Sequence, residues 1–358
     1  MSSNHNQRIS VSLSLPFAPN LPWLAPLAGW SDLPFRLLCR EYGAAVCCTE
    51  MISAKGLICE RRTGNQATRA LLAGAPDDAP LVVQLFGGDP ACMGEAVRLL
   101  ADEGRTYFDC NMGCSVPKVT RAGAGAALLR DRRQALAVAG AMLEAAAPYG
   151  ARVGFKLRLG WEDAQSALLL APELEAVGAA WLTLHPRTAG QGFAGQADWK
   201  AVAKLVGRVR VPVVVSGDLW TAHDGLRCLR ETGARAVMYA RGALRDPAIF
   251  ARHRALCVSG ASAATPSVAA CPEEESPAVL HARIRRHAEL ARTLSPSHTA
   301  LLKMRTAVPR YIRHLEGAGR LRRAIIGCRS WEEFDMLVSD FFPENDFQTT
   351  RALRSGPY

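Results

Sequence analysis

Residues 211–239, VPVVVSGDLWTAHDGLRCLRETGARAVMY, contain one complete strand–helix–strand unit. The run at 211–216 is apolar and of strand length, and the stretch at 222–232 spaces its apolar residues as on one face of a helix. Residues 236–239 are again apolar. A strand followed by a helix and a further strand is the repeating unit of α/β proteins with parallel sheets. The unit therefore predicts a parallel α/β fold wherever it recurs along the chain.

The same alternation recurs from residue 21 to residue 257. Strand and helix, repeated about eight times over roughly 230 residues, predict a (β/α)8 or TIM barrel. An open doubly wound sheet is the alternative, but no G-x-G-x-x-G motif follows the first strand. The predicted strands are 23–26, 45–51, 81–86, 107–112, 153–159, 181–185, 211–216 and 236–239. The predicted helices between them are 33–42, 92–103, 132–147, 165–177, 199–206 and 222–232.

A second region follows the barrel pattern. Residues 258–277, VSGASAATPSVAACPEEESP, lack any periodicity and are rich in Ala, Ser, Pro and acids, which predicts a linker. Residues 278–345 contain helical patterns and predict a small all-α bundle, with helices at 278–294, 298–315, 319–326 and 330–340. The remaining segments are a predicted N-terminal extension at 1–20 and a C-terminal tail at 346–358.

The positive charge of the chain is concentrated in the helical region. The whole chain of 358 residues has a formal net charge of +10, and residues 281–325 alone contain eleven Lys or Arg against two acids. Such a local excess favours a polyanionic partner, and nucleic acid is the commonest one inside cells. A solvated basic helix face without a partner is the alternative.

Several classes of protein are disfavoured by what the sequence lacks. No apolar run is long enough to cross a bilayer, and no N-terminal segment resembles a secretory signal. The eleven cysteines show no C-x-x-C or Cys/His ligand spacing, so we expect reduced thiols and no metal site. We therefore expect a cytoplasmic protein that does not bind membranes. We also expect it to be monomeric.

Polar residues interrupt the apolar strands near their carboxyl ends, where barrel enzymes carry their chemistry. Gln84 in the third strand is equally well explained as a satisfied core amide or as a ligand contact. Cys110 and Asn111 are adjacent in the fourth strand, so their side chains point to opposite faces. If Asn111 faces the barrel, Cys110 is a packing residue. Cys114 follows in the loop beyond that strand, where a thiol would be accessible.

Cationic residues gather at the same predicted rim. Lys156 and Arg158 are two residues apart in the fifth strand and therefore share one face. A cation in a barrel mouth needs an anionic partner, and reduced flavin, which ionises at N1, is one candidate. His185 and Arg187 follow the sixth strand as a second group of donors. A capped turn with a surface arginine is the alternative for this group.

The last two strands end in short polar turns. These are Ser216-Gly217-Asp218 after the seventh strand and Ala240-Arg241 after the eighth. Barrels commonly bind a phosphate at this position through loop amides and a helix N-terminus, and Arg241 would add charge. The polar groups of six strand ends converge on one rim, which predicts a binding site there.

Seven sequence blocks carry a family resemblance. They are LAPLAGWSDLPFRLLCREYGA, PLVVQLFGGDP, FDCNMGCSVPKVTRAGAGAALL, KLRLGW, LTLHPRTAGQGFAGQADW, VPVVVSGD and ARGALRDPAIF. In this order they resemble the tRNA-dihydrouridine synthase family, from about residue 24 to residue 325. The N-x-G-C block, with a Lys-Val pair and a Gly-Ala-Gly run after it, is the most specific of them.

The resemblance implies an FMN-binding barrel, a helical domain that binds tRNA, and NADPH or NADH as the external reductant. It places Cys114 in the proton-donor position, so that reduced FMN gives a hydride to C6 of uridine and Cys114 a proton to C5. We expect Arg158, Arg187, Lys303 and Arg305 to contact the tRNA. The positions implied to bind FMN are Pro26, Leu27, Ala28, Gln84, Asn111, Lys156, His185, Ser216, Gly217, Asp218, Ala240 and Arg241.

The chain departs from the family pattern at a few positions. Members usually have Pro directly after the cysteine, where this chain has Ser115 and a later Pro117. Leu27 stands where Met is common, and Ser216 replaces a usual Asn. The thiol itself is kept, and a neutral thiol, whose ordinary pKa is about 8.5, suits a proton donor.

Two other functions compete with this one. A flavin barrel oxidoreductase of the dihydroorotate dehydrogenase type would keep the flavin site but would not need the basic helical region. An RNA-binding protein without catalysis would need that region but no flavin. Flavin absorbance and the effect of removing the helical region separate the three.

Overall fold

The computed structural model describes residues 18–64, 67–259 and 275–343, and all strands within them run parallel. The predicted strands are all present, with ends shifted by up to three residues. The short β3 was not predicted. The strands are β1 (Trp23–Leu24), β2 (Val46–Cys48), β3 (Ile52–Ser53), β4 (Leu81–Phe86), β5 (Tyr107–Met112), β6 (Arg152–Arg158), β7 (Trp181–His185), β8 (Val213–Val215) and β9 (Ala236–Tyr239).

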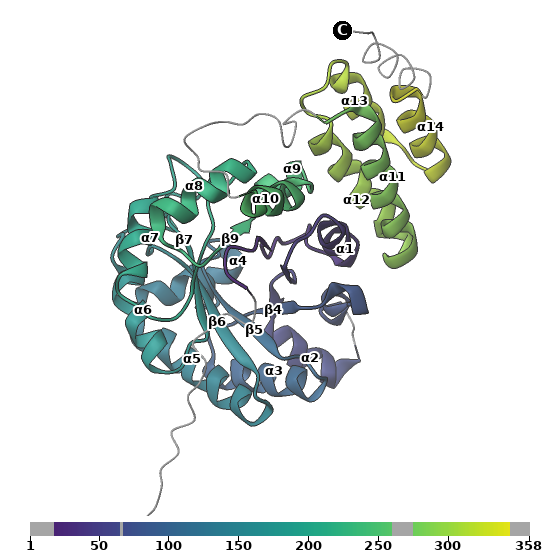
Figure 1. The fold of residues 1–358 in the computed structure, drawn as a ribbon. Helices are drawn as coiled ribbons and strands as arrows, with labels where there is room; N and C mark the ends of the chain where they lie inside the picture. The colour runs from purple at the N-terminus through teal and green to yellow at the C-terminus, as the bar shows by residue number, and fades with distance from the viewer. Residues whose placement is uncertain (1–17, 65–66, 260–274, 344–358) are drawn as a thin grey trace, which may run out of the picture.

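The sheet closes on itself. β1 pairs with β2 on one side and with β9 on the other, and β2 also pairs with β4. Eight strands therefore form a closed barrel, while β3 extends the pairing along β4. Helices surround this barrel as a ring (Figure 1). The predicted TIM barrel is confirmed.

Most barrel helices begin at a side-chain cap. Asp32, Asp89, Asp131 and Asp198 each accept a backbone N–H of the first turn, which satisfies donors that have no partner within the helix. The six predicted helices are confirmed within two residues at either end. They are α1 (Leu33–Glu41), α3 (Pro90–Asp102), α5 (Arg132–Ala146), α6 (Ser166–Ala176), α7 (Trp199–Val206) and α8 (Ala222–Thr232).

Four further helices of the barrel were not predicted. They are α2 (Ala54–Thr63), α4 (Pro117–Thr120), α9 (Arg241–Arg245) and α10 (Ile249–Val258). The signals for α2 are in the sequence, since Ser53 caps its start and Gly64 ends it in a left-handed conformation. α4 and α9 have only four and five residues, which is too short for a periodic pattern.

Apolar side chains fill two layers of the barrel. The larger layer lies between the strands and the surrounding helices, and the smaller one fills the lower barrel interior around Trp23 and Trp181. The two indole rings meet edge to face, with centroids 5.9 Å apart. A Cβ at Gly154 would lie 2.0 Å from the Trp181 ring, so this strand position requires glycine. The packed lower interior leaves the carboxyl ends of the strands to form the site.

The C-terminal helices form a bundle with a core of their own. Side chains such as Ile284, Met304 and Phe334 are almost fully buried within it. The helices are α11 (Pro277–Leu294), α12 (Ser297–Tyr311), α13 (Ala318–Gly327) and α14 (Trp331–Phe341). The predicted all-α region is confirmed. Most of the predicted 1–20 extension and 258–277 linker, and all of the 346–358 tail, lie outside the described residues.

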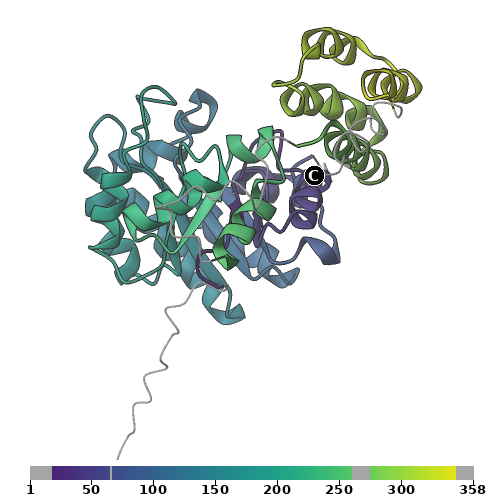
Figure 2. The same ribbon diagram turned by 45° about the horizontal axis from the view of Figure 1, so that its top comes forward.

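This bundle lies beside α1 in both ribbon views (Figures 1 and 2). α11 packs against α1, and α12 packs against α9, so the bundle contacts the helix that follows the first strand and the helix that follows the last strand. Arg283 of α11 is 1% exposed and pairs with Asp246 at 3.0 Å and with Glu275. Arg286 pairs with Glu41 of α1 at 2.7 Å. None of the described helices has the length and apolar character needed to cross a membrane.

Candidate functional site

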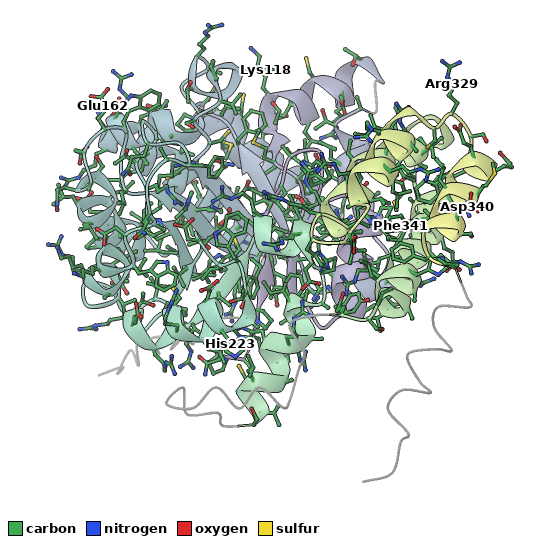
Figure 3. The ribbon with its side chains drawn as sticks, turned by 90° about the horizontal axis from the view of Figure 1, so that it is seen from above. Lys118, Glu162, His223, Arg329, Asp340 and Phe341 are labelled. Carbon is green, nitrogen blue, oxygen red and sulfur yellow. The ribbon has the colours of Figure 1, made fainter. Side chains whose placement is uncertain are left out.

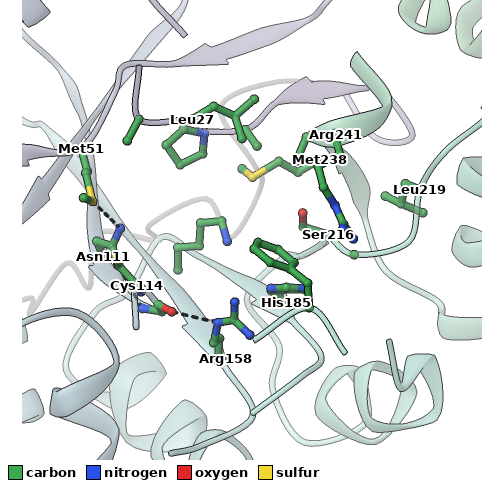
Figure 4. Close-up of a pocket in the computed structure, with 18 of the residues that line it drawn as sticks. Leu27, Met51, Asn111, Cys114, Arg158, His185, Ser216, Leu219, Met238 and Arg241 are labelled. Carbon is green, nitrogen blue, oxygen red and sulfur yellow. Dashed lines mark hydrogen bonds between the residues drawn. The ribbon is translucent and has the colours of Figure 1, made fainter. Parts of the chain in front are cut away.

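A pocket of about 250 Å³ opens at the carboxyl ends of the strands. Cys114 and Asn111 lie on one side of it, and Ser216 and Arg241 lie on the opposite side (Figure 4). Every residue that the sequence predicts for the cofactor lines this pocket, together with Cys114 and Arg158. The predicted residues that line it are Pro26, Leu27, Ala28, Gln84, Asn111, Cys114, Lys156, Arg158, His185, Ser216, Gly217, Asp218, Ala240 and Arg241.

The Cys114 loop is held by hydrogen bonds on both sides. The Asn111 side-chain oxygen accepts the backbone N–H groups of Gly113 at 3.1 Å and of Cys114 at 2.9 Å. The Cys114 carbonyl accepts the N–H of Ala126 at 2.9 Å. The thiol is partly buried and lines the pocket. Asn111 lines the pocket, and Cys110 packs among the buried apolar side chains between strands and helices, as predicted for this case.

The Gly-Ala-Gly run after the cysteine has a steric cause. Gly125 has a φ of +62°, which only glycine adopts at low cost, and a Cβ there would lie 2.5 Å from the Cys114 carbonyl oxygen. The short helix α4 between the two segments begins with Pro117 at a position where its missing N–H costs nothing. Pro117 therefore starts the turn of helix that returns the chain to Cys114.

Lys156 is the one pocket cation without a hydrogen bond or ion pair to any described residue. Its strand neighbour in register is Asn111 on β5, and Thr183 lies beside it on β7. Burial lowers the pKa of the Lys156 ammonium, and the nearby Asp109 carboxyl partly opposes that shift. An unpaired ammonium in a half-buried site is suited to an anionic ligand atom.

His185 is neutral in this site. Burial, followed by the charges of Lys156, Arg158, Arg187 and Arg241, lowers the pKa of its imidazole to about 2. Its Nε2 lies 3.4 Å from Arg187 Nη1 and must accept that hydrogen bond, because a guanidinium only donates. The other ring nitrogen, Nδ1, is therefore the donor.

The two predicted substrate arginines are buried and hold loops. Arg158 donates to the carbonyl oxygens of Gly113 at 2.9 Å, Thr188 at 2.9 Å and Gly192 at 2.7 Å. Arg187 donates to two carbonyl oxygens of its own loop and to Asp218 at 2.6 Å. It is 2% exposed and does not line the pocket. Arg158 thus fastens the Cys114 loop to the β7–α7 loop, and RNA contacts by either arginine stay a prediction.

At the predicted phosphate end, Asp218 organises the two polar turns. Its carboxylate pairs with Arg187 at 2.6 Å and with Arg241 at 3.4 Å, and its φ is +53°. The Arg241 guanidinium also lies 4.5 Å from the Phe193 ring centroid and 4.6 Å from that of Trp220. Asp218 therefore partly neutralises the Arg241 guanidinium, which weakens its attraction for an anionic ligand.

Phe193 and Trp220 are pocket residues that the sequence did not reveal. Both line the site, and they are 61% and 40% exposed. The Phe193 ring also lies 6.0 Å from that of His185. Large exposed aromatic rings at a pocket rim are suited to stacking on a flat ligand. They stand in loops, where no periodic pattern marks them.

The two predicted tRNA contacts of the helical bundle differ in their surroundings. Lys303 Nζ donates to the Gly29 carbonyl at 3.1 Å and pairs with Asp32 at 3.2 Å and Glu50 at 3.7 Å. Glu50 in turn accepts the Gly29 N–H. Lys303 therefore binds the loop after β1, which lines the pocket. Arg305 has no ion pair with any described acid.

Seven of the eleven basic residues in 281–325 form no ion pair with a described acid. Those that do are Arg283, Arg286, Arg292 and Lys303. Arg310 instead lies 3.9 Å from the Trp30 ring centroid, again over the loop after β1. The other unpaired ones are Arg285, Arg305, Arg313, Arg320, Arg322 and Arg323.

Comparison with known proteins agrees with this architecture. The family model described as "Dihydrouridine synthase (Dus)" matches residues 23–345. The chain belongs to the dihydrouridine synthase family.

Three relatives illustrate the similarity, two of them called probable tRNA-dihydrouridine synthase. The protein from Treponema pallidum is 38% identical over 66% of this chain and 71% of its own length. That from Mycobacterium leprae is 32% identical over 88% of this chain and 86% of its own. The tRNA-dihydrouridine synthase B of Xanthomonas axonopodis pv. citri is 36% identical over 69% and 72%.

Among solved structures, a morphinone reductase is similar at a TM-score of 0.45 and 16% identity, over 68% of this chain and 88% of that one. The two residues after the cysteine that differ from the usual family pattern, Ser115 and Pro117, stand at the start of α4. Ser115 lies between Cys114 and the start of α4, and Pro117 opens that helix.

Proposed function

We propose that this protein is a flavin-dependent tRNA-dihydrouridine synthase that reduces the C5–C6 double bond of uridine. Family membership and the names of its relatives support this function. The observation that carries it is the Cys114 thiol, which lines a pocket at the carboxyl ends of the strands on the side opposite Arg241. A proton donor and an anion-binding end thus face the same cavity.

The pocket residues suit FMN. The unpaired Lys156 ammonium, the neutral His185 and the amides of Gln84 and Asn111 offer polar contacts to a flat ring system. Ser216, Gly217, Asp218, Ala240 and Arg241 would hold the phosphate, and Pro26, Leu27 and Ala28 would pack against the ring. When bound and reduced by NADPH or NADH, FMN supplies the hydride for C6 of the uracil.

The chain's own residues provide the rest of the reaction. The Cys114 thiol gives its proton to C5 of the base. Asn111 and Arg158 hold the loop on which that thiol stands, through the N–H of Cys114 and the carbonyl of Gly113. A base that is reduced here has to leave its stack in folded RNA, which costs a few kcal/mol. Contacts between phosphates and the unpaired bundle arginines offset that cost.

The distribution of cations favours tRNA over a small substrate. A dehydrogenase of small metabolites has no use for exposed arginines such as Arg313, Arg320 and Arg323 on a separate bundle. Lys118, directly after the Cys114 loop, and Arg329 of the bundle extend outward along the same edge of the molecule (Figure 3). A polyanion along that edge would contact both domains.

The test compares wild-type protein with Cys114→Ala. We expect the purified wild type to carry flavin and to form dihydrouridine in unmodified tRNA transcripts with NADPH. Cys114→Ala should keep flavin and tRNA affinity but lose roughly a thousandfold or more in rate, because general acid catalysis supplies about that factor. Cys59→Ala, an exposed cysteine on α2, is the matched control and should react normally. Absence of dihydrouridine from wild-type reactions, or near-normal turnover by Cys114→Ala, would refute the proposal.

A further inference from the structure

Asp109 is a buried carboxylate of the barrel interior that the proposed reaction does not use. It is 3% exposed and stands on β5, where its neighbours Phe108 and Cys110 pack toward the helices. Asp109 and Asn111 therefore face the barrel interior. Burying a carboxylate without a full set of partners is costly. Burial raises the pKa of Asp109 to about 7, although the Gln84 hydrogen bond and Lys156 oppose the shift.

A continuous chain of hydrogen bonds leads from this carboxylate to the Cys114 loop. Gln84 Nε2 donates to Asp109 Oδ2 at 2.7 Å. Asn111 Nδ2 donates to Gln84 Oε1 at 2.9 Å. Asn111 Oδ1 then accepts the backbone N–H groups of Gly113 and Cys114. The register explains the geometry, because Gln84 on β4 and Asp109 on β5 are paired neighbours and Asn111 is the next residue on the same face.

This series of hydrogen bonds has only one consistent direction. The N–H groups of Gly113 and Cys114 can only donate, so Asn111 must present its oxygen to them and its NH2 group to Gln84. Gln84 must then accept at Oε1 and donate from Nε2. The chain has to end on an acceptor, and Asp109 provides it. The two backbone N–H groups at one end and the carboxylate at the other thus fix which way both amides point, a choice that an amide alone leaves open.

We propose that Asp109 is a positioning residue for Cys114, which acts through Gln84 and Asn111 to fix the backbone of the cysteine loop. This role rests on the proposed function, in which Cys114 gives the proton. In Asp109→Asn the last residue of the chain can donate as well as accept. Gln84 can then turn over, and the reversed order would set the Asn111 NH2 group against two backbone N–H groups. The loop would lose its anchor while the volume of the side chain stays the same.

The first experiment needs neither flavin nor RNA. The alkylation rate of Cys114 in the apo-protein is followed by peptide mass spectrometry, which separates it from the other cysteines. We expect it to rise about threefold or more in Asp109→Asn, because a freed loop opens more often. Thr183→Val is the matched control. Thr183 is fully buried on β7, two strands away from Asp109 in the barrel. Its hydroxyl has no hydrogen-bond partner among the described residues, and it takes no part in the hydrogen bonds that lead to Cys114. An unchanged alkylation rate in Asp109→Asn would overturn the proposal.

The second experiment is a double-mutant cycle in single turnover. Flavin reduction by NADPH is followed alongside in Asp109→Asn, and oxidation of the reduced enzyme by tRNA should slow about tenfold more than flavin reduction does. In a Cys114→Ala background the same change should cost less than about twofold, because residues that act through one another are not additive. Equal losses in both backgrounds would show that Asp109 acts elsewhere.

Gln84→Met removes the middle residue of this series of hydrogen bonds and replaces Asp109→Asn in the test if that variant does not fold. It should give the same rise in Cys114 alkylation, and an unchanged rate would again contradict the role. Failure of the proposed function is distinguishable from failure of this inference. In the first case wild-type protein forms no dihydrouridine, and in the second wild type is active while the alkylation rates of wild type and variant agree.

Discussion

The barrel mouth and the helical bundle both collect cationic side chains, but the two groups face different partners. In the barrel, Arg158, Arg187 and Arg241 donate mainly to carbonyl oxygens and to Asp218, and Lys156 remains unpaired. In the bundle, three cations pair with acids of the barrel, and seven of the basic residues of 281–325 have no described acid partner. The number of cations in a region therefore does not tell which of them lack a protein partner and can bind a ligand. The barrel uses most of its cations to shape loops, whereas the bundle leaves most of its own exposed to solvent.

The first prediction concerns the unpaired cation of the barrel, Lys156. Lys156→Met should weaken FMN binding about ten- to a hundredfold, because a charge-assisted hydrogen bond contributes about 1.5–3 kcal/mol. Quenching of flavin fluorescence on titration of the apo-protein measures this. Lys55→Met, an exposed lysine on α2, should leave the affinity unchanged. Equal affinities of the two variants would show that the Lys156 ammonium does not contact FMN.

A bundle cation that faces the barrel should matter for stability. Arg283→Met removes a buried partner of Asp246 and Glu275, and we expect a loss of about 3 kcal/mol in the free energy of unfolding of the full chain. Urea unfolding followed by tryptophan fluorescence tests it. Arg285→Met is the matched control, because Arg285 is exposed and has no described acid partner. A loss of similar size in both variants would contradict the docking role of Arg283.

The buried carboxylate of the barrel gives a pH-dependent prediction. The folded-state pKa of Asp109, about 7, lies above the unfolded value, so the folded protein binds the proton more tightly. This contribution to stability is complete below pH 4 or so and disappears as the pH rises through about 7. Asp109→Asn lacks it, so the variant should gain stability relative to wild-type apo-protein between pH 5 and pH 8, by roughly a few kcal/mol.

Thermal unfolding of the two proteins over this pH range measures the difference. Titration of His185 and His287, whose folded-state pKa values are lowered by burial, affects both proteins alike and cancels in the comparison. A difference in unfolding temperature that does not change with pH would show that Asp109 titrates normally in the folded protein.

The smallest expected effect separates two neighbours on α12. Arg305→Ala should make the dependence of log tRNA affinity on log salt shallower by about one, because one phosphate contact is lost. Lys303→Ala should leave this slope unchanged, since Asp32 and Glu50 already neutralise the ammonium. Filter binding at several salt concentrations gives both slopes. A shallower slope for Lys303→Ala would mean that its contacts with the barrel open when RNA binds.

The fold could be read from the sequence because its signals are local. A short apolar strand such as 236–239 and an amphipathic helix such as 222–232 are each encoded within a dozen residues. Cys114 and the polar strand ends were predictable for a related reason, since barrel topology places all strand ends on one rim. The pairing of Lys303 with Asp32 was not predictable, because it depends on how the bundle docks. The role of Phe193 was not predictable because an aromatic residue in a loop belongs to no periodic pattern.

The bundle's contacts with both α1 and α9 have a consequence for how the chain folds. α1 follows β1 and α9 follows β9, and these two strands close the barrel on each other. The Arg286–Glu41 pair joins positions 245 residues apart. Contacts of such long sequence separation form late, because the intervening chain has to be ordered first. Helices that follow the barrel in the sequence therefore contact both sides of the junction between its first and last strands. Removing the bundle should therefore make the closed barrel open more easily at this junction.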